Sequence, residues 1–524
     1  MKKDKQQFGQ YMTPQLICDF MVEMIEHDKS DSVLEPACGD GAFLKSLKNH
    51  SFFNVKAYEI DQKIIDRNFN VQNESFVSSS IDEKFDVVIG NPPYIRWKNM
   101  ENNLKKELEN SSLWNTYCNS LCDYSSIFII KSIEQLKPDG ELIFITPEYW
   151  LSTTHSSPLR NYILSNGFIS EIYHFNETPI FQDVTVSLII FKFIKNKAQK
   201  RNLKVVKYFS KKKLTECDIK NIKNKSATTV KEFTIPQYEQ NSRWILADTH
   251  TQNIINQFEI KCAVQKYDFL FSNIESKCNY EKIGTYFDIG NGMVSGLDKA
   301  FQIPDNFELT AEEIKASLQV LKAKNIEQYT HSETTRYIFI NKPITEEEFK
   351  TNFPNYHSLL QQYVEPLKKR YNYNREIPYW EWVFLRNYNL FSKQTDRILV
   401  PCKERITKKS RFRFCLADNT IYPTQDVTAL LKKSSTKEDI LYVLALLNSK
   451  YVFDWLSYKG IRKGDIIEFS EKPLSMIPFR KIDFKNPIEV KLHDTIVSLT
   501  NDYINTKNKS ILDEIDINID KLME

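Results

Sequence analysis

The chain has 524 residues, of which 41% are hydrophobic and 27% charged, and its formal net charge is +3. This composition is typical of a globular protein with two to four domains, and the absence of a run of about 18 apolar residues argues against a membrane-spanning chain. The nine cysteines are scattered and lack the spacing of a zinc site. These features predict a cytoplasmic protein with reduced thiols and no metal.

The charge is distributed unevenly along the chain. Residues 1–191 hold 17 Lys and Arg against 26 Asp and Glu, a net charge of −9, whereas the remaining residues carry +12. A basic second half predicts that most contact with a polyanion occurs there.

Short apolar strands alternate with helices over about the first 190 residues. The predicted strands are residues 32–34, 55–58, 85–89 and 141–146, and the predicted helices are residues 42–49, a run from residue 62, and residues 127–136. This alternation predicts an α/β domain with a parallel, doubly wound, Rossmann-like sheet.

The pattern changes beyond about residue 240. Short strands, turns and aromatic residues follow, which predicts a mixed α+β domain, and the last residues repeat apolar side chains at helical spacing. We therefore predict three parts, namely residues 1–240, residues 241–485 and a C-terminal helical segment of residues 486–524.

A turn with two glycines follows the first predicted strand, in the sequence Glu35-Pro36-Ala37-Cys38-Gly39-Asp40-Gly41. Gly39 and Gly41 let the backbone approach a ligand closely, and Glu35 is placed to pair with an ammonium group. Glu59, at the end of the second strand, is placed to accept hydrogen bonds from a ribose diol.

These features by themselves leave S-adenosylmethionine and a dinucleotide both open as the ligand. A dinucleotide site normally has a third glycine and a helix N-terminus that faces the pyrophosphate. Here the third glycine is absent, and Glu35 would repel a pyrophosphate. The turn therefore favours a zwitterionic cofactor without phosphate.

The third predicted strand, residues 85–89, runs directly into Asn91-Pro92-Pro93-Tyr94. The amino nitrogen of adenine is a poor nucleophile, because its lone pair is delocalised into the ring. Two acceptors aimed at its hydrogens would stabilise the positive charge that develops on it. The Asn91 side-chain oxygen and the Pro92 carbonyl are the candidates, the prolines stiffen the turn, and Tyr94 offers a ring for an extruded base.

Together these motifs resemble the gamma class of adenine-specific DNA methyltransferases, and within it the Type II enzymes with a TaqI-like C-terminal specificity domain. The resemblance rests on Phe8-Gly9-Gln10-Tyr11-Met12-Thr13-Pro14, the turn from Glu35 to Gly41, Glu59-Ile60-Asp61 and the Asn91 motif. It covers about the first 190 residues well and continues more loosely to the C-terminus. It implies N6 methylation of a flipped-out adenine, with S-adenosylmethionine as the cofactor and double-stranded DNA as the substrate.

The resemblance also implies roles for single residues. Thr13 would close over the methionine moiety of the cofactor, and Phe181 would stack on the flipped base opposite Tyr94. The implied catalytic residues are Asn91, Pro92, Pro93, Tyr94 and Phe181. The implied cofactor-binding residues are Thr13, Glu35, Pro36, Ala37, Gly39, Gly41, Glu59, Ile60, Ser75, Asn91 and Phe128.

One position departs from the pattern of the family. The family usually has an acid before a Phe at the end of its own third strand, which precedes the strand predicted here at residues 85–89. That acid contacts the amino group of the cofactor's adenine. This chain has Ser75 before Phe76, with Glu74 one residue earlier. Either Ser75 or Glu74 is therefore a candidate for that contact.

The second half of the chain contains segments that resemble the family's target-recognition domain, beginning with residues 283–292. Within it, residues 403–414 form a basic run with interleaved aromatic residues, a pattern that suits the sugar-phosphate backbone. We predict phosphate contacts from Lys408, Lys409, Arg411 and Arg413.

Two other functions use similar motifs. A methyltransferase acting on RNA or protein glutamine faces the same electronic problem at nitrogen, although such enzymes are usually shorter. A DNA-specificity subunit with a vestigial cofactor fold is the third reading, which intact Asn91, Glu35 and Glu59 disfavour. For the preferred function we expect a monomer on DNA, no membrane partner, and either a separate cognate restriction endonuclease or a solitary role.

Overall fold

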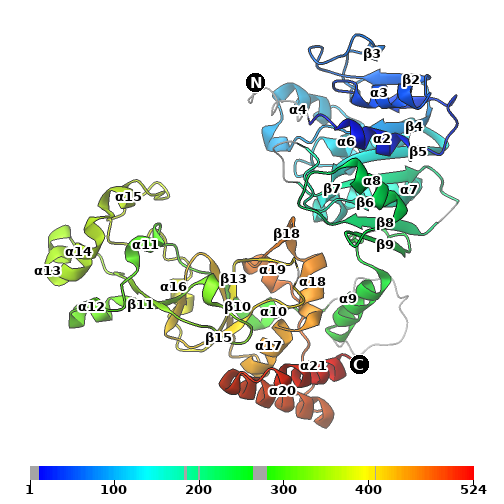
Figure 1. Cartoon of the computed structure of the whole chain (residues 1–524). Coiled ribbons are helices and arrows are strands. Elements are labelled where there is room, and N and C mark those ends of the chain that lie inside the picture. The colour runs from blue at the N-terminus through cyan, green and yellow to red at the C-terminus, as the bar shows by residue number, and fades with distance from the viewer. Residues whose placement is uncertain (1–10, 182–185, 199–200, 264–279, 408) are drawn as a thin grey trace. The chain divides into compact units, whose positions relative to one another are not determined.

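The computed structural model describes residues 11–181, 186–198, 201–263, 280–407 and 409–524. The chain divides into two compact units, Met1–Thr249 and His250–Glu524, and each is described here by itself (Figure 1). Within the described residues, no helix has both the length and the apolar character needed to cross a membrane.

A nine-stranded sheet forms the centre of the first unit, with the strand order β3-β2-β1-β4-β5-β7-β6-β8-β9. Its strands are β1 (Val33–Glu35), β2 (Val55–Tyr58), β3 (Val71–Gln72), β4 (Phe85–Gly90), β5 (Leu136–Pro147), β6 (Phe168–His174), β7 (Leu188–Ile194), β8 (Leu203–Tyr208) and β9 (Val230–Ile235). Strands β1 to β5 pair in parallel. The predicted α/β fold is thereby confirmed.

Helices cover both faces of this sheet, as Figure 1 shows. Val87 and Ile143 pack in one apolar cluster with residues of α2, α3 and α8, and their neighbours Val88 and Leu142 pack in another with residues of α6 and α7. The helices are α2 (Gln15–Val22), α3 (Ala42–Asn49), α4 (Asn102–Glu109), α5 (Ser112–Tyr117), α6 (Ser125–Gln135), α7 (Ser157–Asn166) and α8 (Glu216–Asn224), with the short 3-10 helices η1 (Trp97–Asn99), η2 (Glu148–Leu151) and η3 (Thr154–Ser156). Burial on both faces explains why these strands are nearly continuous apolar runs.

The prediction of a parallel sheet was wrong in detail. The sheet is not wholly parallel, because β7 pairs antiparallel with β5 and β6, and β9 pairs antiparallel with β8. Among the described residues between β6 and β7 there is no helix, in keeping with their antiparallel pairing, since the helical crossover is needed only between adjacent parallel strands.

The predicted helix from residue 62 is a series of turns between β2 and β3. Asp61 accepts a hydrogen bond from the backbone N–H of Lys63 at 3.0 Å, and Asp66 accepts one from that of Asn68 at 2.9 Å. Short aspartate side chains that bond backbone two residues ahead stabilise turns at the expense of a helix.

The second unit contains three small sheets, with the strand orders β10-β17-β13-β15, β12-β11-β16 and β14-β19-β18. Their strands are β10 (Phe287–Asn291), β11 (Ser317–Leu321), β12 (Thr335–Ile338), β13 (Arg397–Pro401), β14 (Lys403–Arg405), β15 (Cys415–Ala417), β16 (Ile421–Pro423), β17 (Val427–Lys432), β18 (Ile461–Lys463) and β19 (Ile466–Glu468). Neighbouring strands pair antiparallel except β11 and β16, which are parallel.

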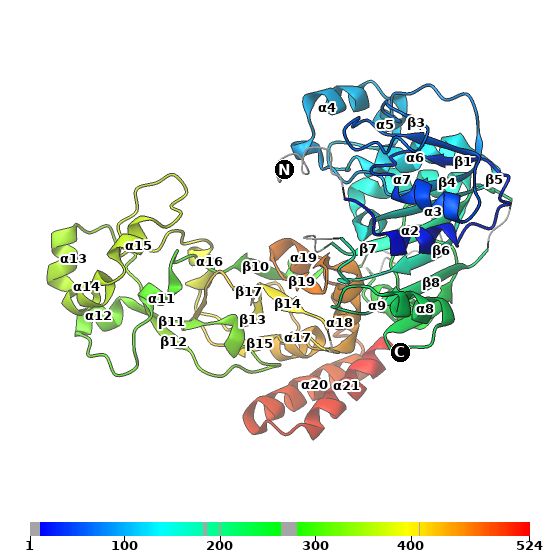
Figure 2. The same cartoon turned by 45° about the horizontal axis from the view of Figure 1, so that its top comes forward.

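Helices surround these sheets and end in the hairpin of α20 and α21, which is drawn in red in Figure 2. They are α9 (Thr249–Lys261), α10 (Ile283–Tyr286), α11 (Asp298–Phe301), α12 (Ala311–Lys315), α13 (Glu346–Asn352), α14 (Pro354–Gln361), α15 (Val364–Lys368), α16 (Tyr388–Phe391), α17 (Ile440–Leu447), α18 (Lys450–Lys459), α19 (Glu471–Ser475), α20 (Pro487–Thr506) and α21 (Ser510–Met523), with the 3-10 helix η4 (Ala323–Asn325). The predicted C-terminal helical segment thus lies in the second unit.

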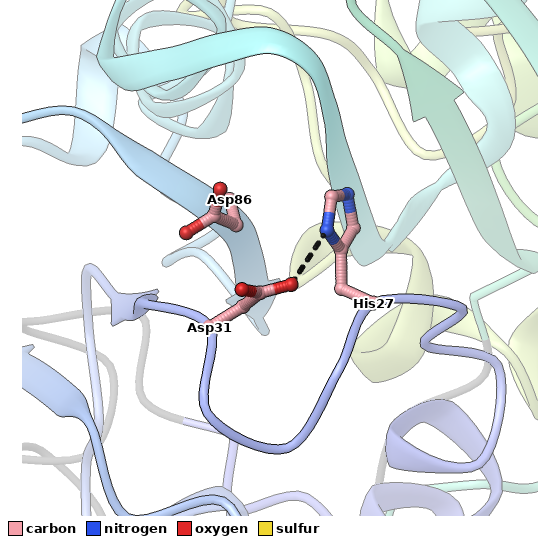
Figure 3. Close-up of side chains that lie close together, drawn as sticks. All are labelled: His27, Asp31 and Asp86. Carbon is pink, nitrogen blue, oxygen red and sulfur yellow. Dashed lines mark hydrogen bonds and ion pairs between the residues drawn. The ribbon is translucent and has the colours of Figure 1, made fainter.

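A polar cluster lies beside the amino ends of β1 and β4. The ligand-type atoms of His27, Asp31 and Asp86 lie within 4.8 Å of one another, and His27 Nδ1 bonds to Asp31 Oδ2 at 3.1 Å (Figure 3). Asp86 Oδ2 also accepts hydrogen bonds from Ser32 Oγ at 2.7 Å and Lys137 Nζ at 2.7 Å. These hydrogen bonds explain the cluster, because they hold the loop before β1 against strand β4.

Asp86→Asn is expected to lower the free energy of unfolding at pH 7 by about 1 kcal/mol, since it weakens one charged hydrogen-bond set. Burial alone would raise the pKa of Asp86, but the bonds from Lys137 and Ser32 outweigh it and lower that pKa to about 2. A depressed folded-state pKa stabilises above the pKa of unfolded aspartate, and this stabilisation is lost as the pH falls toward 2. Urea unfolding at pH 7 and pH 3 should therefore show a smaller wild-type advantage at pH 3; an equal advantage at both would contradict this role.

Candidate active site

The two predicted site loops begin at adjacent strands of the first unit. Strand β1 pairs in parallel with β4 through Val33 with Val87 and Leu34 with Val88. The strand order reverses direction between these two strands, which is the place where α/β sheets bind ligands beyond their carboxyl ends. The turn after β1 and the Asn91 corner after β4 therefore lie at one edge of the sheet.

A pocket opens at this edge, with an empty volume of about 680 Å³ that includes solvent at its mouth. The lining residues are Tyr11, Met12, Pro36, Ala37, Gly39, Glu59, Ile60, Glu74, Ser75, Phe76, Asn91, Pro93, Ile95, Leu104, Tyr124 and Phe128. Eight residues predicted to bind the cofactor are among them, namely Pro36, Ala37, Gly39, Glu59, Ile60, Ser75, Asn91 and Phe128.

The glycine turn has the backbone conformation that its sequence predicts. Gly39 and Gly41 have φ angles of +55° and +80°, a region that side chains with a Cβ rarely adopt. A Cβ on Gly39 would also lie 3.5 Å from Met12 Sδ. The two glycines therefore let the chain leave β1 and enter α3 close to the pocket.

Glu35 is fully buried at the end of β1 and, although it precedes the lining residue Pro36, it is not itself among the residues that line the pocket. Among the described residues, neither oxygen of its carboxylate has a hydrogen-bond partner. Burial, and then the negative charges of Glu59 and Asp40, raise the pKa of Glu35 well above its ordinary value. A buried carboxylate without a partner is costly, and a cationic amino group brought next to it would satisfy it.

Glu59 holds the loops at the pocket together. Its Oε2 accepts a hydrogen bond from the Gly39 backbone N–H at 2.9 Å, and its Oε1 accepts one from that of Asp61 at 2.9 Å. Burial raises the pKa of Glu59. Each carboxylate oxygen can accept a further hydrogen bond, so Glu59 is able to bind a diol while it braces the turn.

Part of the pocket wall is aromatic. The rings of Phe76 and Phe128 lie 5.5 Å apart between centroids, and those of Tyr124 and Phe128 lie 5.3 Å apart. Both Glu74 and Ser75 line the pocket beside Phe76. Both candidates for the contact with the cofactor's adenine amino group therefore remain.

Asn91 connects the site to the N-terminal segment. Its Nδ2 donates to the backbone carbonyl of Tyr11 at 2.9 Å and to Thr13 Oγ1 at 3.0 Å. These two bonds use the amide nitrogen, and the oxygen Oδ1 faces the hydroxyl of Tyr94 instead. Thr13 is buried and lies outside the pocket lining, so it contacts the site through Asn91.

The hydroxyl of Tyr94 lies against two acceptors, Asn91 Oδ1 and the carbonyl of Ile145, the latter at 2.6 Å. A phenol has one proton and donates it to one acceptor at a time. Burial, and then the charge of Asp123, raise the pKa of Tyr94 well above its ordinary value, so the hydroxyl keeps this proton at neutral pH.

Tyr94 and Phe181 belong to one aromatic cluster, which the ring of Tyr11 completes. Tyr11 stacks on Tyr94 with the centroids 6.0 Å apart and on Phe181 with the centroids 5.8 Å apart. The sequence analysis placed Tyr11 only within a motif and gave its ring no role. Tyr11 lies two residues before Thr13, in the motif that resembles the family. This was the one signal that could have indicated that its ring belongs to the site.

Some predicted residues lie outside the part of the chain that the structure describes, namely Phe8, Gly9, Gln10 and Lys408. The pocket wall also contains residues for which the sequence predicted no role in the site, namely Met12, Phe76, Ile95, Leu104 and Tyr124.

The other predicted DNA-binding cations are already paired with carboxylates of the second unit. Lys409 and Arg413 bond to Oε1 of buried Glu404, Arg413 at 2.8 Å, and Arg411 bonds to Asp516 at 2.5 Å. Arg413 also donates to the carbonyl of Ile326 at 2.9 Å. These side chains hold the fold around β14, and their contact with phosphate stays a prediction.

Comparisons with known proteins agree on one class. A family model described as Eco57I restriction-modification methylase matches residues 22–181. The chain is 46% identical to the Type II methyltransferase M.HindII of Haemophilus influenzae over 98% of this chain and 97% of the relative. It is 43% identical to M.HincII of the same species, again over 98% and 97%.

A solved structure, of the Type IIL restriction-modification enzyme MmeI in complex with DNA, covers 97% of this chain and 72% of its own chain. The TM-score is 0.56 and the sequence identity 12%, so this likeness shows a shared fold.

Proposed function

We propose, from the premise that this chain belongs to the Type II methyltransferases of restriction-modification systems, that it methylates the N6 amino group of adenine in double-stranded DNA. The observation that carries the proposal is the placement of the Asn91 corner and the Glu35 turn after adjacent parallel strands. At that edge an acceptor for an amino group and a pocket for a methyl donor lie side by side.

S-adenosylmethionine is the methyl donor, and it supplies an electrophilic methyl group on a sulfonium. Residues that line the pocket, together with the buried Glu35, fit this molecule. The unpartnered carboxylate of Glu35 suits its amino group, Glu59 suits the ribose hydroxyls, and the aromatic wall at Phe76 and Phe128 suits the adenine ring. Two carboxylates beside an aromatic wall suit a cationic cofactor and disfavour a pyrophosphate, which they would repel.

The chain's own contribution to the chemistry centres on Asn91. Its Nδ2 is held by Tyr11 and Thr13, so the orientation of its amide is set before the substrate arrives. The oxygen Oδ1 and the carbonyl of Pro92 then accept hydrogen bonds from the target amino group and draw its lone pair out of conjugation with the ring. Acceptors that are already oriented stabilise the developing charge without a reorganisation cost.

Base flipping follows from this assignment, because an amino group inside a duplex cannot reach Asn91. We assign Tyr94 and Phe181 to the flipped base and the unit His250–Glu524 to the reading of the DNA sequence. The full-length match to relatives named as methyltransferases supports a separate cognate endonuclease. By contrast, RM.Eco57I of Escherichia coli is named as both a restriction enzyme and a methyltransferase, and the match spans 44% of its length. We also propose that the enzyme acts on DNA as a monomer.

The test is modified-base sequencing of DNA from cells that express either the wild-type chain or Asn91→Ala. We expect N6-methyladenine at one short sequence with the wild type and its loss with the variant. Transfer of tritiated methyl from S-adenosylmethionine to duplex DNA, but not to RNA or protein, should accompany it. Unmodified adenine in both samples, or label on RNA or protein instead, would overturn the proposal.

A further inference from the structure

The ring of Tyr11 takes part in two sites at once. It stacks on Tyr94 and on Phe181, the two rings assigned to the flipped base, and it also lines the pocket assigned to the cofactor. The aromatic surface that an incoming adenine would use is therefore covered by a side chain of the protein itself.

The acceptor assigned to the base is engaged as well. Asn91 Oδ1, which is to receive a hydrogen bond from the adenine amino group, faces the hydroxyl of Tyr94. The backbone of Tyr11 is in turn fixed to Nδ2 of the same Asn91. In this arrangement a ring and a hydroxyl of the chain make contacts of the two kinds, stacking and hydrogen bonding, that an adenine would make.

We propose that Tyr11 occupies the place of the target base in the DNA-free enzyme and is displaced when adenine enters. The inference rests on the proposed function, because it identifies the incoming group as a flipped adenine. Tyr11 is thus a positioning residue that keeps Tyr94 and Phe181 apart and solvent away from Asn91 until the base arrives.

The physical consequence is a competition. An aromatic pair contributes about 0.5–1.5 kcal/mol beyond the burial of its surface, and the base must replace these contacts before it gains its own. Because Tyr11 also forms part of the cofactor pocket, its displacement links the binding of base and cofactor. Such a link is reciprocal, so each ligand changes the affinity for the other by the same factor.

The experiment uses the full-length enzyme with S-adenosylhomocysteine, which cannot donate a methyl group. The probe is a duplex with the sequence found by modified-base sequencing and 2-aminopurine at the methylated adenine, whose fluorescence rises when the base leaves the stack. Tyr11→Ala removes the competing ring, whereas Tyr11→Phe, the matched control, keeps it. We expect the flipping equilibrium constant to rise about 5- to 160-fold with alanine, the factor that corresponds to the two aromatic pairs of Tyr11, and to match the wild type with phenylalanine.

Circular dichroism and a cooperative thermal unfolding transition check that each variant is folded. Tyr11→Leu, which retains volume without a flat ring, carries the same expectation if the alanine variant does not fold. Unchanged or lower fluorescence in a folded alanine or leucine variant would overturn the proposal and show that Tyr11 is a fixed wall of the site. That result, with wild-type methylation intact, removes only the role of Tyr11. Absence of adenine methylation by the wild type removes the proposed function instead.

Discussion

Replacing Asn91 by alanine is expected to lower the turnover number by about 10²- to 10³-fold, the usual cost of removing one oriented polar group that stabilises a developing charge. In the proposed reaction the side chain supplies the acceptor Oδ1 at the target nitrogen, and this interaction strengthens only as the nitrogen becomes positive. A group that acts in this way changes kcat far more than substrate binding.

The structure adds a second effect to this prediction. Asn91 also holds Tyr11 and Thr13 through Nδ2, so the alanine variant loosens the segment beside the cofactor pocket. Thr13→Val separates the two effects, because it removes one anchor of the amide and leaves Oδ1 in place.

The measurement is single-turnover methylation of duplex DNA together with calorimetric affinity for S-adenosylmethionine. We expect Thr13→Val to lower turnover by less than about tenfold, the effect of one weakened neutral hydrogen bond. Turnover of Asn91→Ala within tenfold of the wild type would show that Asn91 does not act on the reacting nitrogen.

Replacing Glu35 by glutamine is expected to affect binding and stability in opposite directions. Loss of one partner of a buried charge pair costs about 2–5 kcal/mol, which corresponds to a rise of at least about 30-fold in the Kd for S-adenosylmethionine. The free enzyme, in contrast, loses a buried carboxylate that has no hydrogen-bond partner among the described residues. Its melting temperature at pH 8 should therefore increase.

The pH dependence follows from the raised pKa of Glu35, caused first by burial and then by Glu59 and Asp40. The folded enzyme holds this proton more tightly than the unfolded chain, so wild-type stability decreases as the pH rises above the ordinary glutamate range. The cofactor's ammonium group requires the ionised carboxylate, so affinity should increase over the same range. Glutamine should flatten both dependences, with a residual slope in stability from Glu59, whose pKa is also raised.

Asp40→Asn is the matched control, because it removes a carboxylate charge from the same turn at an exposed position. We expect its Kd for S-adenosylmethionine to change by less than about threefold, the size of a surface electrostatic effect. Calorimetry and thermal unfolding from pH 5 to pH 8 provide both measurements. An unchanged Kd for Glu35→Gln, or equal effects of the two substitutions, would contradict the pairing of Glu35 with the cofactor.

The local sequence was sufficient to predict that the glycine turn and the Asn91 corner follow buried strands at one edge of the sheet. A buried parallel strand is a short apolar run, and such runs locate the ends of β1 and β4 within a residue or two. Because the carboxyl ends of parallel strands meet at one edge, residues as far apart as Gly39 and Asn91 could be assigned to one pocket, which both of them line. Close relatives agree with the class of enzyme that these motifs imply.

The same reasoning failed where side chains choose among competing partners. The run of residues after Asp61 contains enough apolar side chains to suggest a helix, but Asp61 and Asp66 bond their own backbone and form turns. The basic run that contains Arg411 and Arg413 gave no sign of the carboxylate partners that the fold brings to them, Asp516 and Glu404. Their predicted contact with phosphate stays a prediction.

For this protein, then, the positions of the first strands along the chain, their ends and the residues on the loops that follow them could be predicted from the sequence alone, since they depend on burial patterns that repeat over a few residues. Tertiary structure alone decided which side chains meet across about 80 to 170 positions, such as the ring of Tyr11 against those of Tyr94 and Phe181. Such contacts depend on how whole elements pack, and each polar or aromatic group has many partners of similar energy until packing selects one.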